Sequence, residues 1–114
     1  MNQPTEAFRP HVLADISPRS PVPGGVARFV HSDSMTLAFW TFEAGAVVGT
    51  HSHPHEQVTN VLEGSFELVV DGIPYCLEAG TGGTIPPNIP HSGRALTACT
   101  LIDVFHPVRE DYRL

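Results

Sequence analysis

Four side chains in this sequence have the types and the spacing of a metal site. His51, His53 and Gln57 lie in the run GTHSHPHEQ, and His91 follows in PPNIPHSG. Residues two apart in an extended segment point to the same side, so His51 and His53 can approach one ion together. His91 must come from a different strand to complete the set. Three imidazoles and one carboxamide oxygen therefore predict a mononuclear metal centre.

The donor types limit which ion and which substrate such a centre would accept. Imidazole suits several transition metals, and a neutral carboxamide oxygen adds a weak, hard ligand. Four protein ligands leave coordination positions for water or substrate. Because all four are neutral, a divalent ion keeps its full charge, which favours an anionic, chelating substrate. We therefore expect one divalent transition metal ion (Ni, Mn, Fe or Zn) and a small anionic substrate.

Not every histidine is expected to be a ligand. The chain has seven, and a single His in a strand is usually a packed or surface residue, as we expect for His11 and His31. His55 follows the parity of the HxH pair, but Pro54 interrupts the strand. The alternation therefore leaves open whether His55 joins the site.

A second group of reactive side chains lies near the C-terminus, in TLIDVFHPVREDY. Alternation places Leu101, Asp103 and Phe105 on one face of a strand. An Asp in so apolar a strand is costly to bury unless it is paired or used. Arg109, just past the strand, could fold back and hold an anion bidentately. The alternative is an Asp103–Arg109 salt bridge that closes this end of the fold.

Short strands must position these groups. Eleven Pro and ten Gly interrupt the chain, so no stretch sustains a helical period. Asp71-Gly72 predicts a two-residue hairpin turn, because both central positions need positive φ, and Gly64 predicts a turn just before it. The pattern indicates an all-β barrel or sandwich. The runs expected to form strands are VARFVH, MTLAFWTFE, QVTNVLEG, SFELVV, IPYCL and TACTLIDVF.

The length of 114 residues fits a single domain. Residues 1–24, with several prolines and scattered polar residues, look like an arm laid on the surface or on a partner subunit. Residues 25–114 are expected to form the barrel. A core this small would gain stability from a metal ion or from dimerisation.

Composition excludes several classes of function. The net charge is −6 and the chain has no Lys, so no basic stripe can neutralise phosphates and nucleic acid is not an expected partner. The longest apolar runs are far shorter than the ~20 residues of a spanning helix. The first ten residues lack the parts of a signal peptide, so we expect no membrane association and a cytoplasmic location. Cys76 and Cys99 form no CxxC pair and are expected to be reduced core residues.

The first group of donors resembles a motif of the cupin family. Gly45 is followed after five residues by His51 and His53, then after three by Gln57 and after six more by Gly64. This spacing is similar to the first cupin motif, G(X)5HXH(X)3-4E(X)6G. The one departure is Gln57, which stands where the family usually has Glu.

The segment around His91 resembles the second cupin motif, G(X)5PXG(X)2H(X)3N. Gly80 is followed after five residues by Pro86, and Asn88 stands in place of the motif's glycine. Ala95 takes the place of the final Asn. The resemblance implies an all-β, single-domain, double-stranded β-helix (jelly-roll) barrel with the metal inside it, commonly assembled as a homodimer.

The closing pattern D-x-F-x-P-x-R-E-D, together with HSHPHEQ, is similar to the small cupins of the pectin-degradation (KdgF-like) type. These isomerases ketonise 4,5-unsaturated monouronates released from pectin and alginate. In that family the HxH pair, the Gln and the later His bind the metal, while the Asp, Phe and Arg line the active site. The resemblance therefore implies metal binding by His51, His53, Gln57 and His91, and catalytic roles for Asp103, Phe105 and Arg109.

The reaction implied by this resemblance assigns one task to each catalytic side chain. Arg109 would grip the substrate carboxylate, Asp103 would move the proton that turns an enol into a ketone, and Phe105 would orient the sugar ring. A cupin barrel hosts many functions, so two alternatives stay open. One is a cupin dioxygenase, because three His with open positions also suit Fe or Mn. The other is a non-catalytic metal- or ligand-binding module; a purely structural barrel is a third, weaker reading.

Overall fold

The protein is built from short antiparallel strands. The computed structural model describes residues 8–113, and no helix in this part of the chain is long and apolar enough to cross a membrane. The six expected runs all contain strands, and four further strands come from segments without such a pattern. The elements are η1 (Leu13–Asp15), β1 (Arg19–Val22), β2 (Gly25–His31), β3 (Thr36–Phe42), β4 (Val47–His51), β5 (Glu56–Glu63), β6 (Ser65–Val70), β7 (Ile73–Glu78), β8 (Gly82–Ile85), β9 (His91–Ala95), β10 (Cys99–His106) and η2 (Glu110–Tyr112).

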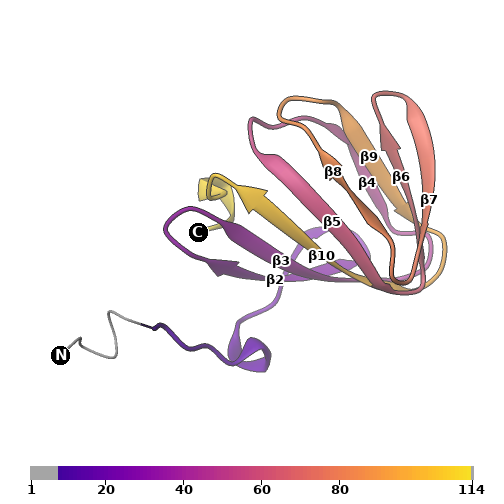
Figure 1. Ribbon diagram of the computed structural model, residues 1–114. Helices are drawn as coiled ribbons and strands as arrows, with labels where there is room; N and C mark the ends of the chain where they lie inside the picture. Colours follow the sequence, from indigo (N-terminus) through magenta and orange to yellow (C-terminus); the bar gives the residue numbers. More distant parts are fainter. Residues whose placement is uncertain (1–7, 114) are drawn as a thin grey trace.

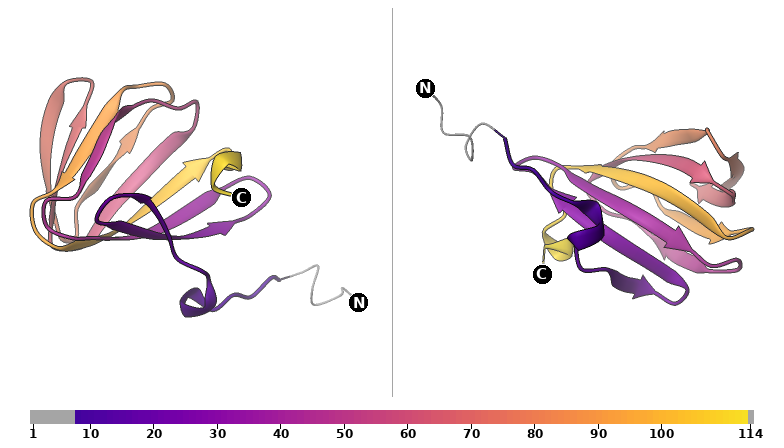
Figure 2. Two further views of the ribbon diagram at one scale, coloured as in Figure 1. Left: turned by 180° about the vertical axis from the view of Figure 1, so that it is seen from behind. Right: turned by 90° about the horizontal axis from the view of Figure 1, so that it is seen from below.

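The strands form two sheets that splay apart at one end and meet at the other (Figure 1). One has six strands in the order β1-β2-β3-β10-β5-β8, and the other has four in the order β4-β9-β6-β7. This arrangement confirms the predicted all-β jelly-roll barrel. Figure 2 shows the same two layers from behind and from below, with residues 8–18 projecting away from them.

The N-terminal segment divides differently from the sequence-based assignment of 1–24 to an arm. Arg19–Val22 forms the edge strand β1, which pairs with β2 in the six-stranded sheet. Residues 1–7 lie outside the described residues.

Strand β10 lies in the middle of the six-stranded sheet, between β3 and β5. Its burial alternates as predicted: Leu101, Asp103 and Phe105 are buried, and Ile102 and Val104 face the other side. An Asp is therefore built into the inner face of the central strand.

The two cysteines differ in burial. Cys99 is buried in β10, as expected, whereas Cys76 is exposed, so its assignment to the core is wrong. The reason is topological: Cys76 lies on β7, the edge of the four-stranded sheet, where Leu77 is the buried residue. Neither cysteine forms a disulfide.

The predicted turns are confirmed by their backbone angles. Asp71 and Gly72 have φ values of 50° and 79° and join β6 to β7, as a two-residue turn with positive φ requires. Gly64 has a φ of 78° and turns the chain from β5 into β6.

Two adjacent glycines of β8 offer a matched test of packing. A Cβ on Gly82 would clash with the backbone oxygen of Thr59, whereas a Cβ on Gly83 would meet nothing within 4 Å. We expect Gly82→Ala to lower the free energy of unfolding by about 1–3 kcal/mol, because β5 must move, and Gly83→Ala to lower it little. Urea denaturation of the two variants checks this, and equal effects would contradict it.

Candidate metal centre

The three histidines of the predicted site come from two paired strands and the turn between β4 and β5. His51 ends β4, and the strand register places it opposite His91, the first residue of β9. Their ring centroids are 4.3 Å apart. His53 lies beyond the end of β4, so it belongs to the turn and not to the strand that carries His51. The strand stops before Pro54, which supplies no backbone N–H for a ladder.

The structure nevertheless brings all four predicted donors together. The ligand nitrogens of His51, His53 and His91 lie within 4.8 Å of one another. Gln57, the second residue of β5, places its Oε1 3.1 Å from Nε2 of His53. Three of the four side chains are buried and His51 is exposed, so the cluster is reachable from solvent on one side.

The backbone sets the tautomer of each imidazole. Each Nδ1 lies 2.8–3.0 Å from a main-chain carbonyl oxygen two residues away. A carbonyl only accepts, so Nδ1 carries the proton and Nε2 keeps a free lone pair, as in metal-ligating histidines. The pairs are His51 with Gly49, His53 with His55, and His91 with Ile89.

Acceptor atoms in this group of side chains lack a donor at two places, and a bound cation would satisfy both. Nε2 of His91 is buried and has no hydrogen-bond partner within the described part of the chain. Nε2 of His53 faces the Oε1 of Gln57, so two acceptors point at each other. A buried acceptor without a donor is costly, and a positive ion is the partner that suits both. The donor set therefore fits a metal ion.

The imidazoles of His53 and His91 are neutral at ordinary pH, as ligands must be. Burial, helped by the positive field of Arg109 and by His91, lowers the pKa of His53 to about 4. Burial also lowers the pKa of His91. Both side chains therefore keep a lone pair at neutral pH.

The metal-free protein should lose part of its stability on acidification through His53. The folded pKa of about 4 lies below the unfolded value of 6.5, so this contribution is present above pH 6.5 and is lost as pH falls toward 4. Between pH 7 and 5.5 we expect the wild type to lose about 1 kcal/mol of unfolding free energy relative to His53→Asn. Asp103 acts in the opposite direction in both proteins and cancels in the difference. Urea denaturation of both proteins at the two pH values, with a chelator present, measures this difference. An equal change of unfolding free energy with pH in the two proteins would contradict the prediction.

His55 does not join the three-histidine cluster. Its Nδ1 is buried without a hydrogen-bond partner in the described residues, and burial and Arg109 lower its pKa. Its main-chain oxygen serves the site by holding Nδ1 of His53.

Asp103 lies beside the group of metal donors, and hydrogen bonds through one hydroxyl link it to Gln57. Its Oδ1 accepts a 2.6 Å hydrogen bond from Thr59, which accepts one of 2.9 Å from Nε2 of Gln57. Burial raises the pKa of Asp103 to about 6, although Thr59, Gln57 and Arg109 oppose the rise. A carboxyl with this pKa exchanges protons readily near neutral pH.

Arg109 is held in place without Asp103. Its Nε and Nη2 donate to the two carboxylate oxygens of Asp111 at 3.0 and 2.8 Å. Its guanidinium carbon lies 4.8 Å from the ring centre of Phe105 and 4.2 Å from that of Tyr112. The alternative of an Asp103–Arg109 salt bridge is therefore wrong. One edge of the guanidinium is used by Asp111, and Nη1 remains for a ligand.

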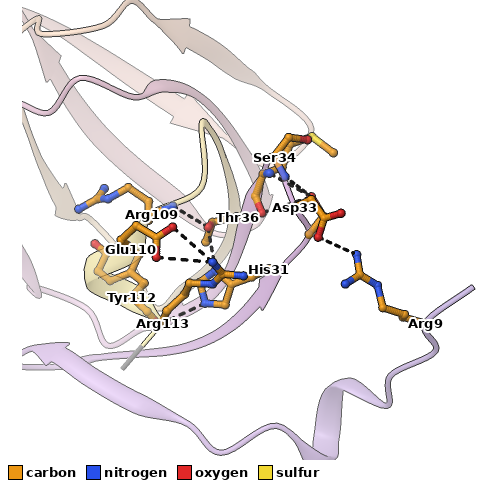
Figure 3. A network of polar contacts seen from close by, with 11 residues as sticks. Arg9, His31, Asp33, Ser34, Thr36, Arg109, Glu110, Tyr112 and Arg113 are labelled. Atoms are coloured by element: carbon orange, nitrogen blue, oxygen red, sulfur yellow. Dashed lines mark hydrogen bonds and ion pairs between the residues drawn. The ribbon is translucent and has the colours of Figure 1, made fainter. Parts of the chain in front are cut away.

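The C-terminal segment that carries Arg109 is anchored to β2 and β3 (Figure 3). The backbone N–H of Arg109 donates to Oγ1 of Thr36, and His31 bridges Thr36 and the main-chain oxygen of Tyr112. Figure 3 shows the guanidinium of Arg109 extending away from this network. His31 is thus a packed residue and His11 an exposed one, as predicted.

Both predicted groups contribute to one cavity, which is lined by all the predicted site residues except His53. It encloses about 480 Å³ of empty space, including its open mouth. The sequence-based interpretation missed Thr59, Asp111 and Tyr112, and only the tertiary structure reveals their contacts. The functional side chains on its wall include His51, Gln57, His91, Thr59, Asp103, Phe105, Arg109 and Tyr112.

Residues 38–105, more than half of the chain, match the family model described as a cupin domain. The chain belongs to the cupin family. In this cupin the second motif has Asn88 where Gly is usual, and its φ of 66° is one that Gly and Asn tolerate. The departure therefore keeps the backbone conformation.

This cupin is 31% identical over 109 residues to the pectin degradation protein KdgF of Dickeya dadantii (strain 3937), an alignment covering 92% of this chain and 99% of the relative. The structure of KdgF from Halomonas sp. is similar with a TM-score of 0.83 and 27% identity, covering 89% of this chain and 94% of that one. An RmlC-like cupin from Shewanella frigidimarina NCIMB 400 gives a TM-score of 0.84 and 30% identity, covering 90% and 93%.

Proposed function

We propose that this cupin is a metal-dependent isomerase that ketonises 4,5-unsaturated monouronates. The observation that carries the proposal is the single cavity in which Asp103 and Arg109 stand beside the three-histidine and Gln57 cluster. The similarity to KdgF proteins along nearly the whole chain supports the substrate class. The charges of the site agree with this substrate class, because a centre with neutral protein ligands and a nearby Arg suits an anion.

Arg109 and Phe105 bind and orient the substrate in this proposal. Arg109, fixed by Asp111 and between two aromatic rings, presents Nη1 to the substrate carboxylate. Phe105 forms an apolar wall beside the sugar ring. When bound, the metal supplies a positive charge that stabilises the enolate form of the substrate.

The proton transfer is assigned to Asp103. Opening of the hemiacetal ring leaves an enol, and ketonisation moves one proton from the enol oxygen to the neighbouring carbon of the former double bond. The product has the composition of the substrate, so no other reactant is needed. Asp103, with a pKa near 6, can hold this proton between its two positions.

The proposal is tested by incubating metal-loaded protein with unsaturated galacturonate and following the loss of the conjugated double bond in the ultraviolet. We expect acceleration over buffer, with no oxygen consumed. Loss of absorbance at the buffer rate would reject the substrate class. Oxygen uptake with a substrate would move the assignment to a dioxygenase.

We also propose that the protein is a homodimer whose subunits meet through the outer face of the six-stranded sheet. Apolar side chains occupy this face as well as the inner one, unlike in a sheet with one solvated face. Such a face needs a cover, and a second copy supplies a matching apolar surface. The outward side chains are Val30, Leu37, Phe39, Val58, Ile102 and Val104.

Light scattering should give a mass near twice 12.3 kDa. Phe39→Glu should shift the protein toward monomer, because it buries a charge in the interface. Val47→Glu, an exposed position on the other sheet, is the control and should leave the mass unchanged. A monomeric wild type would refute the proposed assembly.

A further inference from the structure

Thr59 lies between Gln57, a predicted metal ligand, and Asp103, the predicted proton carrier. The proposed function assigns no task to Thr59. The residue is almost fully buried on β5, with 2% exposure. Its hydroxyl accepts a hydrogen bond from Nε2 of Gln57 and donates one to Oδ1 of Asp103. A buried hydroxyl shared by two functional side chains is a candidate for controlling both.

The two hydrogen bonds of the Thr59 hydroxyl can run in only one direction, from Gln57 to Thr59 and from Thr59 to Asp103. It carries one proton and two lone pairs, and the proton is given to the carboxylate of Asp103. The remaining lone pairs can meet only a donor, which selects the nitrogen end of the Gln57 carboxamide. The oxygen end must then point the opposite way, toward His53.

Without this constraint the carboxamide would prefer to turn around. Nδ1 of His53 bears the proton, since it faces the carbonyl of His55, so Nε2 is an acceptor. A reversed carboxamide would donate an N–H to that acceptor, and it would present a donor where the cation needs an oxygen. The observed orientation places two acceptors, Nε2 of His53 and Oε1 of Gln57, 3.1 Å apart. Another interaction must therefore stabilise this orientation.

We propose that Thr59 is a positioning residue that holds the carboxamide oxygen of Gln57 toward the metal centre and ties this ligand to Asp103. The inference rests on the proposed metal site but not on the proposed substrate. The arrangement is built into the sheet: Gln57 and Thr59 are two residues apart on the inner face of β5, and the register sets Thr59 opposite Asp103.

The first test compares Thr59→Val, which keeps the shape but lacks the hydroxyl, with Thr59→Ser, which keeps the hydroxyl. Ni²⁺ is titrated against a chromophoric chelator, with the metal-free proteins checked by circular dichroism. We expect Thr59→Val to weaken Ni²⁺ binding about tenfold and Thr59→Ser to stay within about threefold of wild type. Thr59→Ala, which also lacks the hydroxyl, makes the same comparison if the Val variant fails to fold.

A double-mutant cycle with Gln57→Glu isolates the orientation effect. A carboxylate has two equivalent oxygens, so it presents an oxygen to the metal in either orientation. Thr59→Val should therefore change Ni²⁺ affinity less than threefold in the Gln57→Glu protein. Wild-type affinity in Thr59→Val, equal loss in Thr59→Ser, or the same tenfold loss in the Gln57→Glu background would each overturn the proposal. Tight Ni²⁺ binding without turnover of unsaturated galacturonate would reject the proposed reaction and leave the role of Thr59 intact.

Discussion

Asp103→Asn is expected to lower turnover of unsaturated galacturonate by about 10²–10⁴-fold and to leave metal affinity within about threefold of wild type. Asn has nearly the same shape and still offers an oxygen to the Thr59 hydroxyl, so the link to Gln57 can persist. It cannot take up and release a proton, which is the step assigned to Asp103. Steady-state kinetics and Ni²⁺ titration measure the two effects separately.

The fold should not suffer from this substitution. Burial raises the pKa of Asp103, which means that the folded protein disfavours its charge, so Asp103→Asn should be at least as stable as wild type at pH 8. Asp33→Asn, at an exposed carboxylate that pairs with Arg9, is the matched control. Full activity in Asp103→Asn would remove Asp103 from the mechanism. Joint loss of activity and metal binding would show that Asp103 acts mainly on Gln57 through Thr59.

The features that could be predicted from sequence depend on local geometry. The alternation of β10 placed Asp103 and Phe105 on the inner face because side-chain direction in a strand has a period of two. The Asp71-Gly72 turn followed from backbone angles that few residues adopt. The metal donors were recognisable because they converge through two short motifs rather than through scattered positions.

Two strands outside the expected runs, β8 and β9, carry too few apolar side chains to show a pattern. β8 reads GGTI and β9 reads HSGRA, and each is a strand because a neighbour pairs with it. Gly82 is needed where β8 passes close to Thr59, and Gly93 is needed where β9 passes close to Phe66. Such requirements come from the packing of distant segments and leave no periodic signal.

The misassigned contacts have the same origin. Arg109 and Asp103 are close in sequence and opposite in charge, yet the chain turns after β10 and gives Arg109 a nearer partner in Asp111. The hydroxyl of Thr59 meets Asp103 only because β5 and β10 pair in one particular register. Side chains 44 positions apart cannot be matched from spacing alone.

His91→Ala is expected to abolish stoichiometric metal binding and to lower turnover at least about a thousandfold. His91 faces His51 across the β4–β9 pair, and its buried Nε2 has no other partner in the described residues. Without it the cluster loses its one donor from β9, and the donors that remain come from β4, the turn and β5. Elemental analysis after dialysis, together with the ultraviolet assay, measures both losses. His106→Ala, an exposed histidine at the end of β10, should change neither.

Thermal unfolding separates a lost ligand from a damaged fold. A metal that binds only the folded state stabilises it by about 2.7 kcal/mol at a concentration of 100 times its Kd, so Ni²⁺ should raise the Tm of wild type and of His106→Ala. The Tm of His91→Ala should not respond to Ni²⁺, whatever its value in chelator. A Ni²⁺-dependent rise equal to that of wild type would show that the metal binds elsewhere, because no set of donors that includes His91 could then account for it.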